Sequence, residues 1–191
     1  MISLLGSWDT ALFHLINGQW QNGFLDWFMP FMTDLKNFQY VFPVLAVWLL
    51  VREKKAGIVF LVFFGLTLAI TDPFSSRLLK EWLGRIRPCH LLAEVRLLTD
   101  CNTSYSFPSS HAVNVFAAAF FLSQPWKKLS PLFFGIAGIV GYSRIYIGIH
   151  YPFDVIGGAA IGLLIAWPMR WLKDQTVARW IKSPAWRVDK K

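Results

Sequence analysis

Charged side chains are scarce in this 191-residue chain. They make up 16% of its residues, against about 25% in typical globular proteins. A soluble domain of this size needs a polar shell, and too few charged residues are present to build one. The same composition excludes disordered, coiled-coil and collagen-like chains. Because hydrophobic residues reach 55% and aromatic residues 17%, the composition predicts an integral membrane protein.

Potential metal ligands are also few, with four histidines, two cysteines and eleven acidic residues. No cluster of them has a convincing ligand set for a metal, so we expect no metal and no other cofactor. The formal net charge of +8 could suggest nucleic acid as a partner. However, the basic residues lie mostly between apolar runs and no recognition motif is present. A membrane protein gains such charge from loops that face anionic lipid.

Apolar segments of nearly membrane-spanning length are frequent along the chain. Five of them are Asn37–Val51, Ala56–Thr71, Ser110–Gln124, Leu129–Ser143 and Tyr151–Met169. Because a helix needs about 20 residues to cross a bilayer, we expect most of them to extend into their flanks, for example from Thr71 toward Lys80. Two short segments, Trp8–Ile16 and Phe24–Thr33, are expected to form the first crossing together. The sequence predicts an all-α polytopic membrane protein of about six transmembrane helices, with residues 1–191 as one domain.

Basic residues gather in two predicted turns and in the tail. They are Arg52, Lys54, Lys55, Lys127, Lys128 and seven residues after Met169: Arg170, Lys173, Arg179, Lys182, Arg187, Lys190 and Lys191. With helices at the segments above, all three groups lie on one side, which the positive-inside rule makes cytoplasmic. The segments 84–108 and 141–154 then face the periplasmic or extracellular side.

Two polar clusters on that outer side suggest an anion site. Lys80 and Arg87 are seven residues apart, so a continuing helix would place both on one face, where a phosphate would relieve their repulsion. A basic patch that contacts lipid headgroups is the alternative. The second cluster, Phe107-Pro-Ser-Ser-His111, directly precedes an apolar helix, whose N-terminus attracts anions. Simple capping with an interfacial histidine is the alternative there.

A third cluster, Ser143-Arg144-x5-His150-x3-Asp154, interrupts an otherwise apolar stretch. Ionisable groups at membrane depth are costly and usually functional. Pro152 suits a helix start, which places His150 just before the helix and Asp154 in its first turn. Asp154 can then accept a hydrogen bond from one imidazole nitrogen while the other faces a substrate. A purely structural His–Asp pair is the alternative.

Taken together, the clusters predict an enzyme of phosphoryl transfer. Cations without a metal suit a transition state that spreads negative charge over phosphate oxygens. His150 is a plausible nucleophile that would form a phosphohistidine, which water later cleaves. His150 must then be neutral and His111 protonated, so we expect a bell-shaped dependence of rate on pH.

The three blocks, in this order, resemble the type 2 phosphatidic acid phosphatase superfamily. The pattern is Lys-x6-Arg-Pro (80–88), Pro-Ser-x-His (108–111) and Ser-Arg-x5-His-x3-Asp (143–154), a motif core at about 80–154. The resemblance implies a compact six-helix membrane fold and metal-independent hydrolysis of a lipid phosphate or diphosphate.

The resemblance also implies a role for each motif residue. His150 attacks phosphorus, Asp154 orients His150, and His111 protonates the leaving oxygen. The phosphate is held by Lys80, Arg87, Arg144, the Ser109 side chain and the backbone N–H groups of 109–111. The chain departs from the family at Ser110, where a glycine is common. That substitution restricts the backbone if a positive φ is required, although serine can still donate its N–H.

Both cysteines, Cys89 and Cys101, fall in the same predicted outer segment. An even count in a non-cytoplasmic loop suggests a disulfide if the compartment is oxidising, and two free thiols are the alternative.

The predicted partners are a lipid that bears phosphate or diphosphate and the bilayer itself, while the oligomeric state is open. Undecaprenyl diphosphate is the first choice of substrate. Lipid A 1-phosphate, phosphatidylglycerophosphate and phosphatidic acid are the alternatives. A non-catalytic lipid-phosphate carrier would use the same anion pocket. Vanadium-dependent haloperoxidases share the phosphate motifs but are soluble, which the composition argues against.

Overall fold

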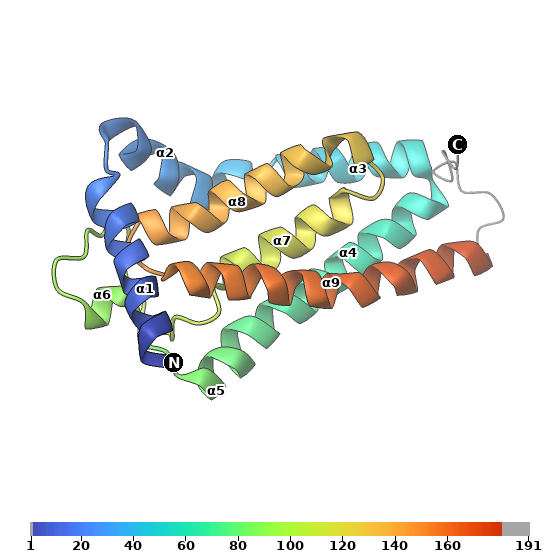
Figure 1. Cartoon of the computed structure of the whole chain (residues 1–191). Coiled ribbons are helices and arrows are strands. Elements are labelled where there is room, and N and C mark those ends of the chain that lie inside the picture. The colour runs from blue at the N-terminus through green and yellow to red at the C-terminus, as the bar shows by residue number, and fades with distance from the viewer. Residues whose placement is uncertain (1, 181–191) are drawn as a thin grey trace.

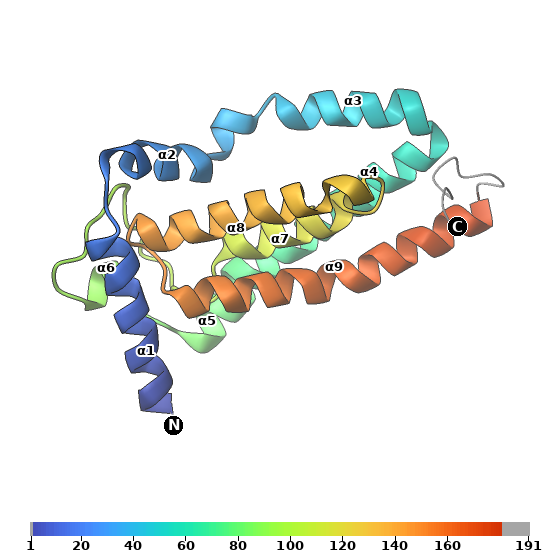
Figure 2. The same cartoon turned by 45° about the horizontal axis from the view of Figure 1, so that its top comes forward.

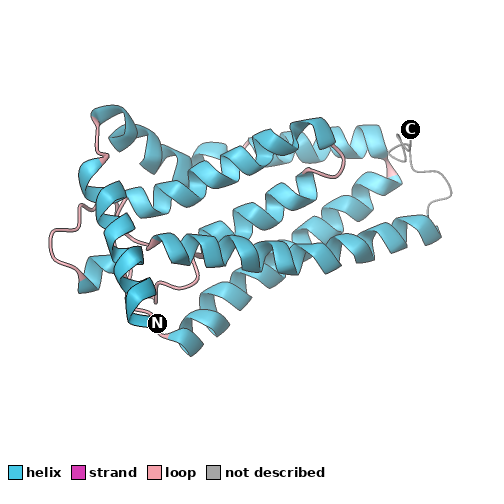
Figure 3. Ribbon diagram, viewed as in Figure 1, coloured by secondary structure: helices cyan, strands magenta, loops and turns pink. Residues whose placement is uncertain are grey.

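The structure is a bundle of helices. The computed structural model describes the backbone of residues 2–180 and the side chains of residues 6–34 and 36–179, and within that part every regular element is helical (Figure 3). The longer elements are α1 (Ile2–His14), α2 (Gly23–Thr33), α3 (Val41–Glu53), α4 (Lys55–Pro73), α7 (Ser110–Leu122), α8 (Ser130–Tyr146) and α9 (Pro152–Trp180). The short ones are η1 (Leu15–Gln19), η2 (Leu35–Phe38), η3 (Phe74–Leu79), α5 (Lys80–Leu83), α6 (Pro88–Leu91) and η4 (Lys127–Leu129).

Helix α7 forms the centre of the bundle. It contacts α4, α8 and α9, which run lengthwise beside it (Figures 1 and 2). Small side chains on α7 allow this close packing, and Ala112 and Ala117 are fully buried. On α9, a Cβ at Gly158 would lie 2.7 Å from the carbonyl oxygen of Ser109. Glycine at this position therefore lets the second turn of α9 approach the start of α7 closely.

Within the described part of the chain, two helical segments are long and apolar enough to cross a membrane, by length and composition. They are Lys55–Leu91 and Pro152–Arg179. Helix α4 continues through η3 into α5 without a gap, so the expected extension of the segment 56–71 toward Lys80 is confirmed.

The N-terminal region differs from expectation. Helix α1 lies across one end of the bundle, whereas α2 runs on toward α3 along its side (Figures 1 and 2). The chain changes direction at residues 20–22, where Asn22 caps α2 by accepting a hydrogen bond from the N–H of Leu25 at 3.0 Å. Because this cap starts a new helix in a new direction, the two segments do not run on as one straight helical rod.

The two ends of the bundle differ in chemistry. The basic turns that contain Lys54 and Lys127 lie at the same end as the C-terminal part of α9 (Figure 1). At that end, Glu53, Gln124 and Lys173 line one cavity. The tail residues Lys182, Arg187, Lys190 and Lys191 lie outside the described residues. The opposite end carries α1, the loops between α5 and α7, and the turn between α8 and α9.

Candidate active site

His150 lies in the tight turn between α8 and α9. Gly148 makes the turn possible, because its φ is +91° and a Cβ there would lie 2.6 Å from the carbonyl oxygen of Arg96. The N–H groups of Ile149 and His150 both donate to the carbonyl oxygen of Arg144. The imidazole is therefore held on a rigid backbone, and it is 2% exposed.

Asp154 orients His150 from the first turn of α9. Its Oδ2 lies 3.4 Å from Nδ1 of His150 and accepts a hydrogen bond from the N–H of Tyr151 at 2.8 Å. The hydroxyl of Ser106 also donates to this oxygen and lies 3.4 Å from Nδ1 of His150. One carboxylate oxygen is thus fixed opposite one nitrogen of the imidazole.

The other nitrogen of His150 faces a cation. Nη1 of Arg87 lies 3.2 Å from Nε2 of His150 and donates to the carbonyl oxygen of Ile149 at 2.9 Å. Because a guanidinium can only donate, Nε2 must be unprotonated and the proton sits on Nδ1, toward Asp154. Burial lowers the pKa of His150 to about 3, despite the opposing effect of Asp154. The imidazole is therefore neutral, with its lone pair available as a nucleophile.

Lys80 and Arg87 come together by a different route from the expected continuous helix. Helix α5 ends at Leu83, and Gly84 follows in the left-handed conformation with φ +60°, while Arg87 is extended. The shared contact is Ser104, whose hydroxyl oxygen lies 3.4 Å from Nζ of Lys80 and 2.9 Å from Nη2 of Arg87. The carbonyl oxygen of Ser104 also accepts from Nε of Arg87 at 2.7 Å.

The N-terminus of α7 completes the site. Ser109 occupies the N-cap position, but its hydroxyl makes no capping hydrogen bond, and its N–H donates to the carbonyl oxygen of Asp154 at 3.0 Å. His111, in the first turn, lies within electrostatic range of Arg144, His150, Lys80 and Arg87. The site thus joins residues from α5, the connection between α5 and α7, the start of α7, α8, the turn after α8 and the start of α9.

Three buried polar atoms of this cluster lack a hydrogen-bond partner among the described residues. They are Oγ of Ser109, Oγ of Ser110 and Nε of Arg144. Unpaired buried donors are costly, and an anion at the helix N-terminus would satisfy them. The predicted phosphate-binding residues therefore form a donor set that suits a tetrahedral oxyanion.

Cys89 and Cys101 are joined by a disulfide across a sequence separation of 12 residues. The bridge begins two residues after Arg87 and ends three residues before Ser104. It therefore holds together the two chain segments, one on each side of the closed loop, that carry Arg87 and Ser104.

Sequence reasoning missed several residues of this cluster. Ser104 and Ser106 lie between two motifs, and only their position shortly before Pro108 could have drawn attention to them. Arg85 lies inside the first motif, yet it was assigned no role. Its Nη1 donates to Oδ1 of Asp154 at 2.7 Å.

Comparisons with known proteins show which family the chain resembles. A family model described as the PAP2 superfamily matches residues 56–177. The chain is 29% identical to a lipid A 4'-phosphatase of Bacteroides thetaiotaomicron over 94% of its own length and 83% of the relative's. It is 32% identical to an undecaprenyl-diphosphatase of Sulfolobus acidocaldarius, covering 83% of this chain and 75% of that one.

A solved structure is also similar. It is a transmembrane PAP2-type phosphatidylglycerolphosphate phosphatase from Bacillus subtilis, with a TM-score of 0.68 and 26% identity. The match covers 93% of this chain and 89% of that one.

Proposed function

Because this chain belongs to the PAP2 superfamily of membrane lipid phosphatases, we propose that it hydrolyses its lipid substrate through a phosphohistidine on His150, without a metal ion. The observation that carries the proposal is the pairing of His150. Its Nδ1 faces Asp154 and its Nε2 faces Arg87, so the nucleophilic lone pair points to the place where cations would hold a phosphate.

The reaction proceeds in two balanced steps. First, Nε2 of His150 attacks phosphorus, the bond from phosphorus to the leaving oxygen breaks, and His111 gives its proton to that oxygen. Water then attacks phosphorus, the phosphorus–nitrogen bond breaks, and His111 recovers a proton from the water. Lys80, Arg87 and Arg144 bind the phosphate oxygens and stabilise the charge that develops on them.

Undecaprenyl diphosphate is the substrate we favour. A relative named undecaprenyl-diphosphatase covers most of the chain, which supports this choice. The alternatives are lipid A 1-phosphate, phosphatidylglycerophosphate and phosphatidic acid, and relatives named lipid A 1-phosphatase and phosphatidylglycerophosphatase B support the first two.

The whole chain would form one membrane domain. The start of α1 and the end of α9 lie at opposite ends of the bundle (Figure 1), which requires an odd number of crossings. The crossings would be α2 with α3, then α4, α7, α8 and α9, with α1 along the membrane surface. This arrangement has one crossing fewer than the sequence predicts, because α1 lies across the bundle. The basic end would face the cytoplasm and the active site the outer side.

Phosphate release by the detergent-purified protein in excess EDTA tests the function. The assay would use the four lipids named above, with His150→Ala as the control. We expect turnover in EDTA on at least one lipid and none in the variant. Turnover that survives in His150→Ala would refute the nucleophile. Lipid-phosphate binding by a wild type that never releases phosphate would indicate a carrier.

A further inference from the structure

Arg85 joins the catalytic carboxylate to a second buried carboxylate on the N-terminal helix. Its Nη1 donates to Oδ1 of Asp154 at 2.7 Å, and its Nη2 donates to Oδ2 of Asp9 at 2.6 Å. Asp9 and Asp154 are both fully buried. One guanidinium therefore binds two buried anions that come from opposite ends of the sequence.

We propose that Arg85 and Asp9 are positioning residues, which hold Asp154 in the orientation that makes His150 a nucleophile. The proposal rests on the proposed function, since it concerns the same reaction. Neither residue lies in the set that would hold the phosphate, and both would act through Asp154.

The two oxygens of Asp154 have separate tasks. Oδ2 faces Nδ1 of His150, while Oδ1 is held by Arg85. Rotation of the carboxylate plane would break the contact with Arg85, so Arg85 holds the carboxylate in the plane that keeps an oxygen opposite Nδ1 of His150. This in turn keeps the proton on Nδ1 and the lone pair on Nε2.

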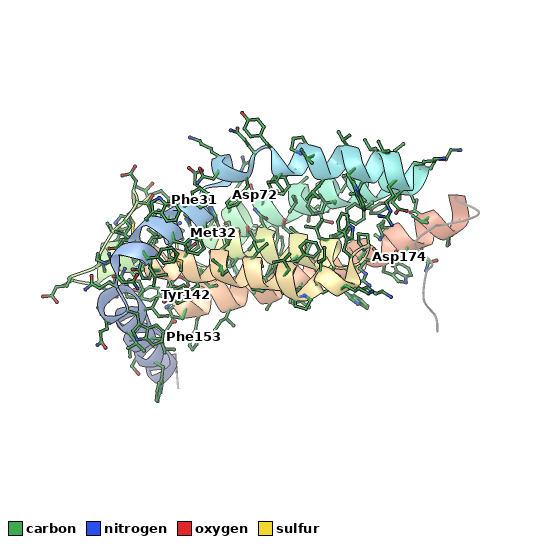
Figure 4. The ribbon with its side chains drawn as sticks, turned by 90° about the horizontal axis from the view of Figure 1, so that it is seen from above. Phe31, Met32, Asp72, Tyr142, Phe153 and Asp174 are labelled. Carbon is green, nitrogen blue, oxygen red and sulfur yellow. A yellow bond between two sulfur atoms is a disulfide. The ribbon has the colours of Figure 1, made fainter. Side chains whose placement is uncertain are left out.

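Asp9 fixes Arg85 in the same way. Its Oδ2 binds the guanidinium, and its Oδ1 accepts a hydrogen bond from the N–H of Phe153 at 2.8 Å. Phe153 lies beside α1 at the start of α9 (Figure 4). The guanidinium also stacks over the ring of Tyr151, with Cζ 4.1 Å from its centroid. Arg85 is thus held on three sides, and α1 is tied to the residues that flank His150.

The chemistry of arginine explains the choice of residue. A guanidinium presents donors in a rigid fork, so it can bind two carboxylates at once in fixed directions. Lysine carries the same charge on a flexible stem without this geometry. A replacement by lysine therefore separates the loss of orientation from the loss of charge.

The test measures kcat and KM for phosphate release by Arg85→Lys, Arg85→Gln, Asp9→Asn and the double variant Asp9→Asn/Arg85→Gln. We expect kcat to fall about 10- to 100-fold in both Arg85 variants, by analogy with the loss seen when a partner that orients a metal-binding histidine is removed. KM should stay within about 3-fold, because Lys80, Arg87 and Arg144 still bind the phosphate. Asp9→Asn should lose less, and the double variant should be no slower than Arg85→Gln alone.

The pH profile gives a readout that a merely structural role would not move. Without the guanidinium, the charge of Asp154 is free to stabilise protonated His150. The acid limb of kcat/KM should therefore move to higher pH in Arg85→Gln and stay in place in Arg85→Lys. Arg77→Gln and Asp100→Asn are the matched controls, since both residues are exposed, and thermal unfolding checks that each variant is folded.

The outcomes separate the two proposals. A wild type that releases no phosphate would overturn the proposed function. A wild type that turns over while Arg85→Gln keeps full kcat would overturn the positioning role alone. A rise in KM with kcat unchanged would also overturn it, because it would assign Arg85 to phosphate binding. Strictly additive losses in the double variant would show that Asp9 does not act through Arg85.

Discussion

At the scale of single residues, the protonation state of His150 decides whether the site can act. The imidazole is enclosed, and Asp154, Arg87, Arg144 and His111 are the charged or titratable groups around it. Burial opposes a charge on the ring, and the two arginines oppose it further, while only Asp154 favours it. The site therefore favours a neutral imidazole over an ion pair with Asp154.

This balance predicts how His150 titrates. A free histidine takes up its proton near pH 6.5, whereas the pKa of His150 is lowered to about 3. The neutral form therefore persists as the pH falls through 6.5 and is lost only near pH 3. Nitrogen NMR of histidine-labelled protein would follow the ring from pH 4 to 8, with His150→Gln to assign its signals. No titration is expected, and a midpoint near 6.5 would contradict it.

Two serines of the site, Ser104 and Ser106, show why part of the site could not be predicted from the sequence. The motif spacing indicated Lys80, Arg87, His111, His150 and Asp154, because charged residues stand out in an apolar chain. Ser104 and Ser106 carry no such contrast, and their partners are distant in sequence. Ser106 contacts Asp154 across 48 residues, a pairing that only the tertiary fold creates.

At the scale of elements, the loop between α5 and α7 brings the first motif to the site. Periodicity predicted that Lys80 and Arg87 share a helix face, but Gly84 ends the helix between them. The fold recovers the same result through the loop, since Ser104 contacts both cations. The prediction that Lys80 and Arg87 lie close together is therefore correct, although the continuous helix on which it was based does not form. Periodicity could not predict that the chain turns back after Cys101 and brings Ser104 against these two cations.

The disulfide at the base of this loop should matter for both stability and binding. Closing a loop of about this size contributes about 3 kcal/mol in the chain-entropy model, which corresponds to about 6–12 °C in the melting temperature of a protein of this size. We therefore expect Cys89→Ser/Cys101→Ser to melt at lower temperature. KM should rise because the Arg87–Ser104 contact loosens. Thermal unfolding and steady-state kinetics measure the two effects.

Comparison with reductant separates the bridge from the side chains. The reduced wild type should behave as the double variant does, and the double variant itself should not respond to reductant. If the oxidised wild type and the double variant melt at the same temperature, the disulfide does not contribute to stability.

At the scale of the whole molecule, composition predicted more than local pattern did. The shortage of charge predicted a helical membrane protein, and the spacing of apolar runs located five of its main helices, α3, α4, α7, α8 and α9. The path of the first 35 residues was not predictable in the same way. Helix α1 is held by contacts such as Asp9 with Arg85, 76 residues away, and no local signal encodes a contact of that kind.

The orientation of the molecule in the membrane gives the last prediction. The basic turns lie at the end opposite the candidate active site, so the positive-inside rule predicts that His150 lies at the outer face. Both native cysteines are in the disulfide, which leaves an added cysteine as the reactive thiol. Trp82, at the active-site end, is 78% exposed, and Lys128, in the opposite turn, is also exposed.

A membrane-impermeant maleimide should therefore label Trp82→Cys in intact cells and Lys128→Cys only after the membrane is permeabilised. The wild type, with its cysteines bridged, is the background control. The opposite pattern would place the active site in the cytoplasm. In that case the disulfide would face a reducing compartment, and the lipid phosphate would have to reach His150 from the inner leaflet. The same two variants thus test orientation and the side from which the substrate enters.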